Sequence, residues 1–159
     1  MTPEAKSSRI LKWAATLAGL GYVPFASGTF GAAAAAIFVW AARPGWYQLL
    51  AIAVIVTVFG AVAAGNAEKE LGKDSRRIII DEVAGYLITV LFLPLSMGVI
   101  IWAFVLFRLF DILKPPPINL LERLPGGIGV MADDIGAGVF ANIILRIAIR
   151  FLGAGLGIG

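Results

Sequence analysis

The feature that most constrains the fold is an uninterrupted apolar run over residues 46–65, which carries no charged side chain. A helix needs roughly 20 such residues to cross the hydrocarbon core of a bilayer. A chain in lipid must satisfy its own backbone hydrogen bonds, and an α-helix does so within one segment. The composition agrees, because 60% of the residues are hydrophobic and 14% are charged, whereas a soluble domain has roughly 25% charged residues. We therefore expect an all-α, compact helical membrane protein that forms one domain over residues 1–159.

Two residue types are absent, and their absence limits the possible chemistry. The chain has no cysteine and no histidine, so thiolate nucleophiles, Cys-ligated zinc and imidazole bases are excluded. Any catalysis must use carboxylates, hydroxyls, Lys, Arg and a bound ion. An all-oxygen ligand set favours Mg²⁺, Mn²⁺ or Ca²⁺. The net charge of +3 comes from dispersed basic residues, which favours contact with anionic lipid and argues against a nucleic-acid partner.

The first segment differs from the rest because it is amphipathic. Over residues 4–20, Lys6, Arg9 and Lys12 lie on one side, which predicts an N-terminal helix lying in the membrane interface. We expect the segments that follow to be several transmembrane or short hairpin helices. Besides 46–65, the expected helices cover 31–42, about 117–124 and Asp133 to about 152, with a turn at Arg43-Pro44-Gly45 and a frayed tail at 153–159.

The apolar segment 83–107 allows two arrangements. As a single helix it would cross the membrane and place Asp81 and Asp111 on opposite sides. As a hairpin it would turn at 94–98, with two short arms, and bring both acids to the same side. We favour the hairpin, because the Pro and Gly at the two ends of that turn disrupt a helix interior.

Basic residues mark one side of the expected bundle. They gather in the N-terminal segment, in 66–77 and in 108–123, whereas the opposing turns at 43–46 and 94–98 carry one Arg between them. Loops rich in Lys and Arg face the cytoplasm. We therefore expect the basic side, and the acidic groups beside it, to face the cytoplasm.

Five acidic residues border the apolar runs in three groups, namely Asp81-Glu82, Asp111 and Asp133-Asp134. A carboxylate near lipid is costly, so its presence there is a functional hypothesis by default. The first and last groups each open an expected helix, where acids can cap free N–H groups and interact favourably with the helix dipole. Two adjacent Asp residues exceed what one cap needs, which favours a functional role for Asp133-Asp134.

Asp111 has no such explanation, because it stands near the end of an apolar helix over 101–113, where the dipole disfavours negative charge. Arg108 and Lys114 stand three residues before and after it, on the same expected helix face. One interpretation is an intrahelical salt bridge. The other is a metal-binding carboxylate between two phosphate-binding cations.

A turn of small residues, Ser27-Gly28-Thr29, opens the Ala-rich run. Such a turn can present N–H groups and hydroxyls to an anion. Close contact between membrane helices selects the same residues, so the pattern is weak by itself.

Four stretches of the chain are specific when they are taken together and in order. They are Ser27–Gly31 (SGTFG), Ile78–Gly85 (IIIDEVAG), Phe107–Pro115 (FRLFDILKP) and Gly126–Gly138 (GGIGVMADDIGAG). The set resembles the phosphatidylglycerophosphatase A family over about residues 20–145. The resemblance implies an enzyme of the bacterial cytoplasmic (inner) membrane that is Mg²⁺-dependent and hydrolyses phosphatidylglycerophosphate to phosphatidylglycerol and phosphate. Asn66 departs from the pattern, since some members have His there.

We combine the residue patterns and the resemblance into one hypothesis for the site. The acids converge and hold one or two Mg²⁺ ions, the cations and hydroxyls bind the phosphate, and the lipid tails stay in the bilayer. Whether one carboxylate acts as a general base or as a nucleophile is left open. The predicted metal-binding and catalytic residues are Asp81, Glu82, Asp111, Asp133 and Asp134, and the predicted substrate-binding residues are Arg108, Lys114, Ser27 and Thr29.

Two other functions use the same kind of residues. An ion- or proton-coupled transporter would need carboxylates deep inside its membrane spans, whereas these lie at segment ends. A CDP-alcohol-type phosphotransferase also binds metal through Asp residues, but its Asp-Gly…Ala-Arg signature is missing here.

Overall fold

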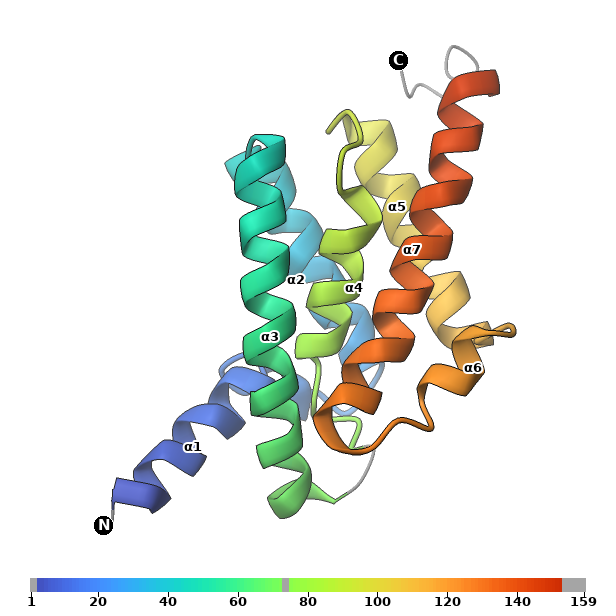
Figure 1. Cartoon of the computed structure of the whole chain (residues 1–159). Coiled ribbons are helices and arrows are strands. Elements are labelled where there is room, and N and C mark those ends of the chain that lie inside the picture. The colour runs from blue at the N-terminus through green and yellow to red at the C-terminus, as the bar shows by residue number, and fades with distance from the viewer. Residues whose placement is uncertain (1–2, 73–74, 153–159) are drawn as a thin grey trace.

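The computed structural model describes residues 3–72 and 75–152, and in that part of the chain every regular element is a helix (Figure 1). The predicted all-α architecture is therefore confirmed. The tail 153–159, which we expected to fray, lies outside the described residues. The elements are α1 (Pro3–Ala15), η1 (Leu20–Tyr22), α2 (Ser27–Ala42), α3 (Trp46–Leu71), α4 (Ile80–Val90), α5 (Met97–Leu113), α6 (Ile118–Leu121) and α7 (Gly126–Leu152).

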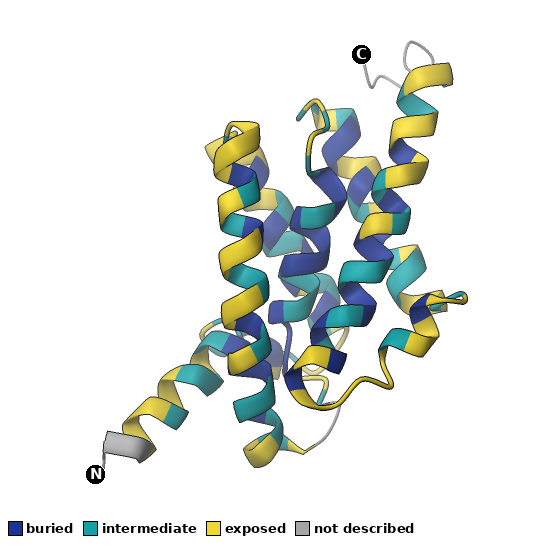
Figure 2. Cartoon of the chain, viewed as in Figure 1, coloured by how far each residue is buried: buried dark blue, intermediate teal, exposed yellow. Residues whose placement is uncertain are grey.

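Two helices, α3 and α7, are long and apolar enough to cross a membrane. The outer face of α3 presents Val54, Ile55 and Val58 to the surroundings (Figure 2), as expected of a helix in contact with lipid. The helix also runs past the apolar stretch 46–65 as far as Leu71, because α1 covers this extension. Figure 1 shows α1 against that end of α3 and tilted away from the bundle.

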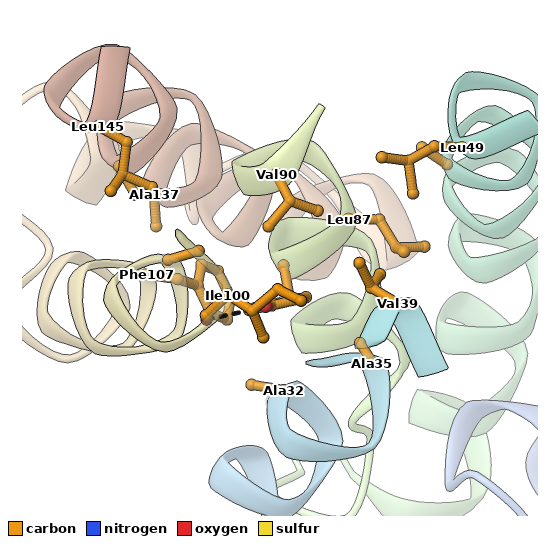
Figure 3. Packing of buried hydrophobic residues seen from close by; sticks show 14 of the residues in the cluster. Ala32, Ala35, Val39, Leu49, Leu87, Val90, Ile100, Phe107, Ala137 and Leu145 are labelled. Carbon is orange, nitrogen blue, oxygen red and sulfur yellow. Dashed lines mark hydrogen bonds between the residues drawn. The ribbon is translucent and has the colours of Figure 1, made fainter. Parts of the chain in front are cut away.

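Helix α4 occupies the centre of the bundle and packs against α2, α3, α5 and α7 (Figure 2). Its residues Leu87 and Val90 are buried, and Figure 3 shows side chains from the four surrounding helices around them. Much of the surrounding core is alanine, because small residues let helices approach closely. The short apolar helix is thus enclosed by protein, which holds both of its ends in fixed places.

Glycines set the closest contact between α4 and α7. A Cβ atom added to Gly138 would lie 2.3 Å from the carbonyl oxygen of Gly85, so no larger residue fits there. Asp81 stands one turn before Gly85 on α4, and Asp134 stands one turn before Gly138 on α7. The two helices run in the same direction in Figure 1. The glycine contact therefore brings the two aspartates to the same end of the bundle.

The hairpin predicted for 83–107 is present, and a single crossing helix is excluded. Helices α4 and α5 pack against each other, and the Tyr86 hydroxyl donates a 3.0 Å hydrogen bond from one arm to the carbonyl of Ile100 on the other. Helix α5 begins after Ser96, whose side chain accepts a hydrogen bond from the N–H of Val99. The turn covers 91–96, so it begins three residues before and ends two residues before the expected turn at 94–98.

Other helix boundaries also differ from the prediction, since α2 begins at Ser27 and not at residue 31. Helix α1 ends at Ala15, not near residue 20, because Leu17 and Ala18 adopt left-handed backbone angles with φ of 49° and 55°. Helix α7 begins at Gly126, not at Asp133. Glycine disfavours helix, but a Cβ on Gly127 would lie 1.9 Å from the carbonyl oxygen of Ala61. Tertiary contact with α3 thus requires glycine where local propensity suggested a loop.

Candidate active site

Three carboxylates from two helices meet at one end of the bundle. Asp81 and Glu82 lie in the first turn of α4, and Asp134 lies on α7. One oxygen from each lies within 4.8 Å of the other two. The glycine contact between α4 and α7 accounts for this proximity. Since α7 begins at Gly126, Asp134 lies well inside the helix, and capping does not explain its position.

The three carboxylates leave buried oxygens without partners. Within residues 3–72 and 75–152, no hydrogen-bond partner reaches Asp81 Oδ1, Glu82 Oε2 or Asp134 Oδ2. Burial, followed by the charges of Glu82 and Asp134, raises the pKa of Asp81 well above its ordinary value. Burial likewise raises the pKa of Glu82. Unpartnered buried carboxylates are unfavourable, and a hard cation with oxygen ligands would satisfy them.

Asp111 borders this group and pairs with Arg108. The guanidinium donates from Nη1 to Asp111 Oδ2, and the same Nη1 lies 4.0 Å from Glu82 Oε1. The charge of Asp111 also acts on Glu82 and Asp134. Arg108 therefore joins α5 to the acids of α4, and its buried Nε has no partner among the described residues.

Lys114 has a different partner from the one that its spacing suggested. It caps α5 in a left-handed conformation with φ of 41°, which takes its side chain off the helix face that carries Asp111. Its Nζ lies 2.6 Å from Asp133 Oδ2 and 3.2 Å from Glu122 Oε2. Burial lowers the pKa of Lys114, and the hydrogen bond to Asp133 raises it, with a net upward shift. The ion pair thus keeps Lys114 charged and occupies one oxygen of Asp133.

A cavity of about 640 Å³ opens beside the acids. Glu82, Arg108, Ser27 and Gly28 are among the residues that line it. The Ser27 hydroxyl donates to the carbonyl of Arg76, so its proton is already used. The predicted donor Thr29 does not belong to the lining.

Gly28 is needed where the cavity meets the acids. A Cβ at this position would lie 1.9 Å from Glu82 Oε1 and 3.1 Å from Arg108 Nη1. The turn of small residues therefore gives the carboxylate and the guanidinium room to reach the cavity. The sequence singled out this turn but gave it the less specific role of presenting donors.

Sequence reasoning missed two cavity residues, Arg76 and Arg77. In the sequence they stood out only as part of the basic stretch 66–77. The signal that could have found them is their position, since two adjacent arginines directly before an acidic helix start must lie near its carboxylates.

Comparisons with known proteins agree with the resemblance. The family model described as phosphatidylglycerophosphatase A matches residues 13–149. A protein of Bacteroides thetaiotaomicron, named as a candidate phosphatidylinositol-3-phosphatase, is 39% identical over 82% of this chain and 87% of its own length. The proteins named phosphatidylglycerophosphatase A from Escherichia coli and Haemophilus influenzae are 36% and 34% identical, each over 80% of this chain and over 76% and 81% of their own lengths. No solved structure gives a significant match.

Proposed function

The chain belongs to the phosphatidylglycerophosphatase A family, and we propose that it removes the terminal phosphate of phosphatidylglycerophosphate to leave phosphatidylglycerol. The observation that carries this proposal is the group of three carboxylates with unpartnered buried oxygens beside a cavity lined by arginines. Cations attract the phosphomonoester, and the carboxylates offer the ligands of a phosphate-activating metal. The site and fold together would form a single membrane-embedded phosphatase domain.

Mg²⁺ is the metal that we propose, because every ligand in the group is an oxygen. Asp81, Glu82 and Asp134 would hold it, with Asp111 and Asp133 beside them. When bound, Mg²⁺ would neutralise phosphoryl oxygens and lower the pKa of a water molecule. The unpartnered oxygens are the feature of this structure that fits a cation.

Arg108 is the residue that we propose for binding the transferred phosphate. Asp111 fixes its guanidinium through Nη1, and its buried Nε lacks a partner in the described part of the chain. A phosphate oxygen would fill that vacancy with a charge-assisted hydrogen bond. Because Nη1 lies 4.0 Å from Glu82 Oε1, a phosphate bound here would lie against the carboxylates. Lys114 pairs with Asp133 and would hold that carboxylate in place.

Two chemical routes remain for the carboxylates, and one experiment separates them. A carboxylate can accept the proton of the attacking water, or it can attack phosphorus itself and form an aspartyl-phosphate. Acid quenching during turnover of substrate labelled in its terminal phosphate distinguishes these routes. Label retained on the protein indicates the nucleophile, and its absence at every quench time indicates the base.

We propose that the site faces the cytoplasm from the bacterial inner membrane. The described parts of the basic segments, namely α1, 66–72, 75–77 and 108–123, lie at the acidic end of the bundle (Figure 1). Loops rich in Lys and Arg stay on the cytoplasmic side. The substrate would keep its acyl chains in the bilayer while its headgroup enters the cavity.

A second substrate has a specific observation behind it. The relative from Bacteroides thetaiotaomicron is named for phosphatidylinositol 3-phosphate, which is also a phospholipid with a phosphomonoester on its headgroup. Parallel assays with both lipids in the same neutral detergent would decide between them. A higher kcat/KM for the inositol lipid would replace the proposed substrate and keep the phosphatase chemistry.

The decisive test of the proposed function is phosphate release by the purified protein from phosphatidylglycerophosphate. We expect activity with Mg²⁺, its loss in EDTA, and its recovery when Mg²⁺ is restored. Asp111→Asn removes the charge that fixes Arg108, so kcat/KM should fall about 10²-fold. Glu70→Gln is the matched control, because Glu70 pairs with Lys12 between α1 and α3 and lies outside the site. Release that is unaffected by EDTA would contradict the metal mechanism.

A further inference from the structure

We propose that Arg76 and Arg77 form a second anion-binding subsite, which holds the phosphodiester of a phospholipid headgroup. The identity of the lipid rests on the proposed function, whereas the subsite itself rests on the cavity. A phospholipid with a terminal phosphomonoester carries two phosphates. Arg108 and the carboxylates beside it account for one of them, and the two arginines would bind the other.

The cavity has room and lining for both groups. Its volume of about 640 Å³ falls within the range of roughly 300–1,000 Å³ that is typical of small-ligand sites. Glu82 and Arg108 line it next to the acids, and Arg76 and Arg77 line it from the segment that precedes α4. Among the side chains that the structure describes, no carboxylate forms an ion pair with either of these two arginines. No described carboxylate therefore competes with an anion for their charges.

The backbone that carries the two arginines is fixed against the first part of the chain. The hydroxyl of Ser27 donates to the Arg76 carbonyl. A Cβ on Gly21 would lie 2.0 Å from the carbonyl oxygen of Arg77, so η1 approaches this segment as closely as only glycine permits. Two residues later, the N–H of Ile79 donates to the Ala15 carbonyl at 2.9 Å. The arginines therefore belong to a positioned wall of the cavity.

Tyr22 orients one of the guanidinium groups. The Cζ atom of Arg77 lies 5.1 Å from the centre of the Tyr22 ring, within the range of a cation–π contact. An arginine stacked on a ring keeps its N–H edge free for a phosphate, and its planar shape suits two phosphate oxygens. Both Tyr22 and Arg77 line the cavity, so this free edge has an anion site beside it.

The same cavity has an apolar side, which is the reason to propose a lipid diester as its ligand. Val23, Pro24 and Ile112 also line it, and the adjoining Phe25 is 80% exposed. In a phospholipid the diester joins the polar headgroup to the glycerol that carries the acyl chains. A cationic wall beside an apolar wall matches that junction.

The test measures binding without turnover, so that it does not depend on the proposed reaction. The protein, purified in neutral detergent with Mg²⁺, is titrated with short-chain phosphatidylglycerol, which has the diester and no monoester. It is titrated separately with inorganic phosphate, which resembles the monoester alone. For Arg76→Gln with Arg77→Gln we expect the Kd of phosphatidylglycerol to rise about tenfold or more and that of phosphate to change less than about twofold.

Two further variants separate a built subsite from general attraction between opposite charges. Arg123→Gln removes a charge from an exposed arginine outside the cavity, and it should leave both affinities unchanged. Tyr22→Leu should weaken phosphatidylglycerol binding, and Tyr22→Phe, which keeps the ring, should restore it.

The possible outcomes distinguish this inference from the proposed function. Unchanged phosphatidylglycerol binding in the double variant would overturn the subsite, as would equal weakening of phosphatidylglycerol and phosphate. If Arg123→Gln lost as much phosphatidylglycerol affinity as the double variant, the subsite would also be overturned, because only the net charge of the protein would then matter. Wild-type protein that shows the expected binding pattern but releases no phosphate from phosphatidylglycerophosphate would support the subsite and contradict the reaction.

Discussion

The two ends of the bundle both carry polar groups among apolar helices, but they differ in how completely hydrogen bonds pair those groups. At one end, the Asn142 amide on α7 donates to the carbonyls of Ile88, Thr89 and Leu91 at 3.3, 2.8 and 2.9 Å. Arg146 donates to Asn142 Oδ1 and to the Leu91 carbonyl. These contacts give the Thr89 and Leu91 carbonyls the partners that the end of α4 does not supply.

At the acidic end the side chains are close together but incompletely paired. Among the described residues, every buried side-chain nitrogen or oxygen without a hydrogen-bond partner lies at this end. These atoms belong to Asp81, Glu82, Arg108, Asp133 and Asp134. A polar cluster that serves only the fold satisfies its own members, as the Asn142 cluster does. A cluster that leaves buried atoms unpartnered is suited to a ligand. The contrast therefore distinguishes polar groups that complete the fold from polar groups that we propose to bind a ligand.

The largest effect should come from Asp134→Asn, which tests the contrast directly. Activity should fall on the order of 10³-fold, because a proposed metal ligand loses its charge. The metal-free variant should nevertheless unfold at a higher temperature than the wild type, since one of several crowded buried charges is gone. Phosphate release and thermal unfolding in EDTA measure the two effects. A variant that stays active and loses stability would place Asp134 among the structural groups.

Gly28→Ala should have the next largest effect. The added methyl group would collide with Glu82 Oε1, at 1.9 Å from the ideal Cβ position, and would force the carboxylate away from Arg108. We expect kcat/KM to fall by roughly 10- to 100-fold, as misplacement in an active site can produce. Gly45→Ala is the matched control, because its nearest neighbour would lie 3.4 Å away. Equal activities of the two variants would show that Glu82 tolerates displacement.

Asn142→Ala should affect stability and spare the chemistry. Removing the amide leaves the buried Thr89 carbonyl unpaired, because the Ile88 and Leu91 carbonyls also accept from the Leu91 N–H and from Arg146. One unpaired buried carbonyl costs about 1–3 kcal/mol. Denaturant unfolding should detect this loss, while kcat measured on folded protein should stay within about twofold of the wild type. Asn119→Ala, at an exposed position on α6, provides the comparison. A selective loss of kcat in Asn142→Ala would mean that the two ends are coupled.

The smallest expected effect is a dependence of metal-free stability on pH. The pKa values of Asp81 and Glu82 are raised in the folded protein, and both residues lie outside the two candidate membrane spans. Below the ordinary carboxyl pKa, near 4, both carboxyl groups are neutral in the folded and in the unfolded protein. As the pH rises from there through the raised values, the unfolded chain releases protons first, so stability falls.

This fall should appear as a decrease of a few degrees in the unfolding temperature in EDTA. Saturating Mg²⁺ should remove it, because the ion binds the charged carboxylates. A double variant, Asp81→Asn with Glu82→Gln, should have a flatter profile than the wild type. An identical profile in that variant would assign the pH dependence to other groups.

The sequence predicted the features that local rules control. Pro and Gly at the ends of 94–98 located the hairpin, since neither residue suits a helix interior. The spacing of Arg108 and Asp111 on one helix face allowed an intrahelical salt bridge as one of two interpretations, and the structure contains that ion pair. The hairpin in turn explains how Asp111, thirty residues after Asp81, comes to lie at the same end of the bundle.

Features that depend on tertiary contact were not predictable from one sequence. Helix α7 includes Gly127 because the surface of α3 leaves room only for glycine there, whereas helix propensity alone argues for a loop. Lys114 pairs with Asp133 because its backbone adopts a left-handed conformation at the end of α5. Residue spacing does not reveal that conformation. Arg76 and Arg77 became cavity residues only once the fold had placed them beside η1.

The contact between Gly85 and Gly138 fixes the relative position of α4 and α7 through backbone atoms alone. Backbone touches backbone at this point, so the relative height of α4 and α7 cannot drift through changes of rotamer. A slip of one turn would move Asp81 about 5.4 Å along Asp134 and would separate the proposed ion ligands. Ion binding should therefore be a direct reporter of helix register, and a substitution at either glycine should be detectable as lost metal affinity before any unfolding is seen.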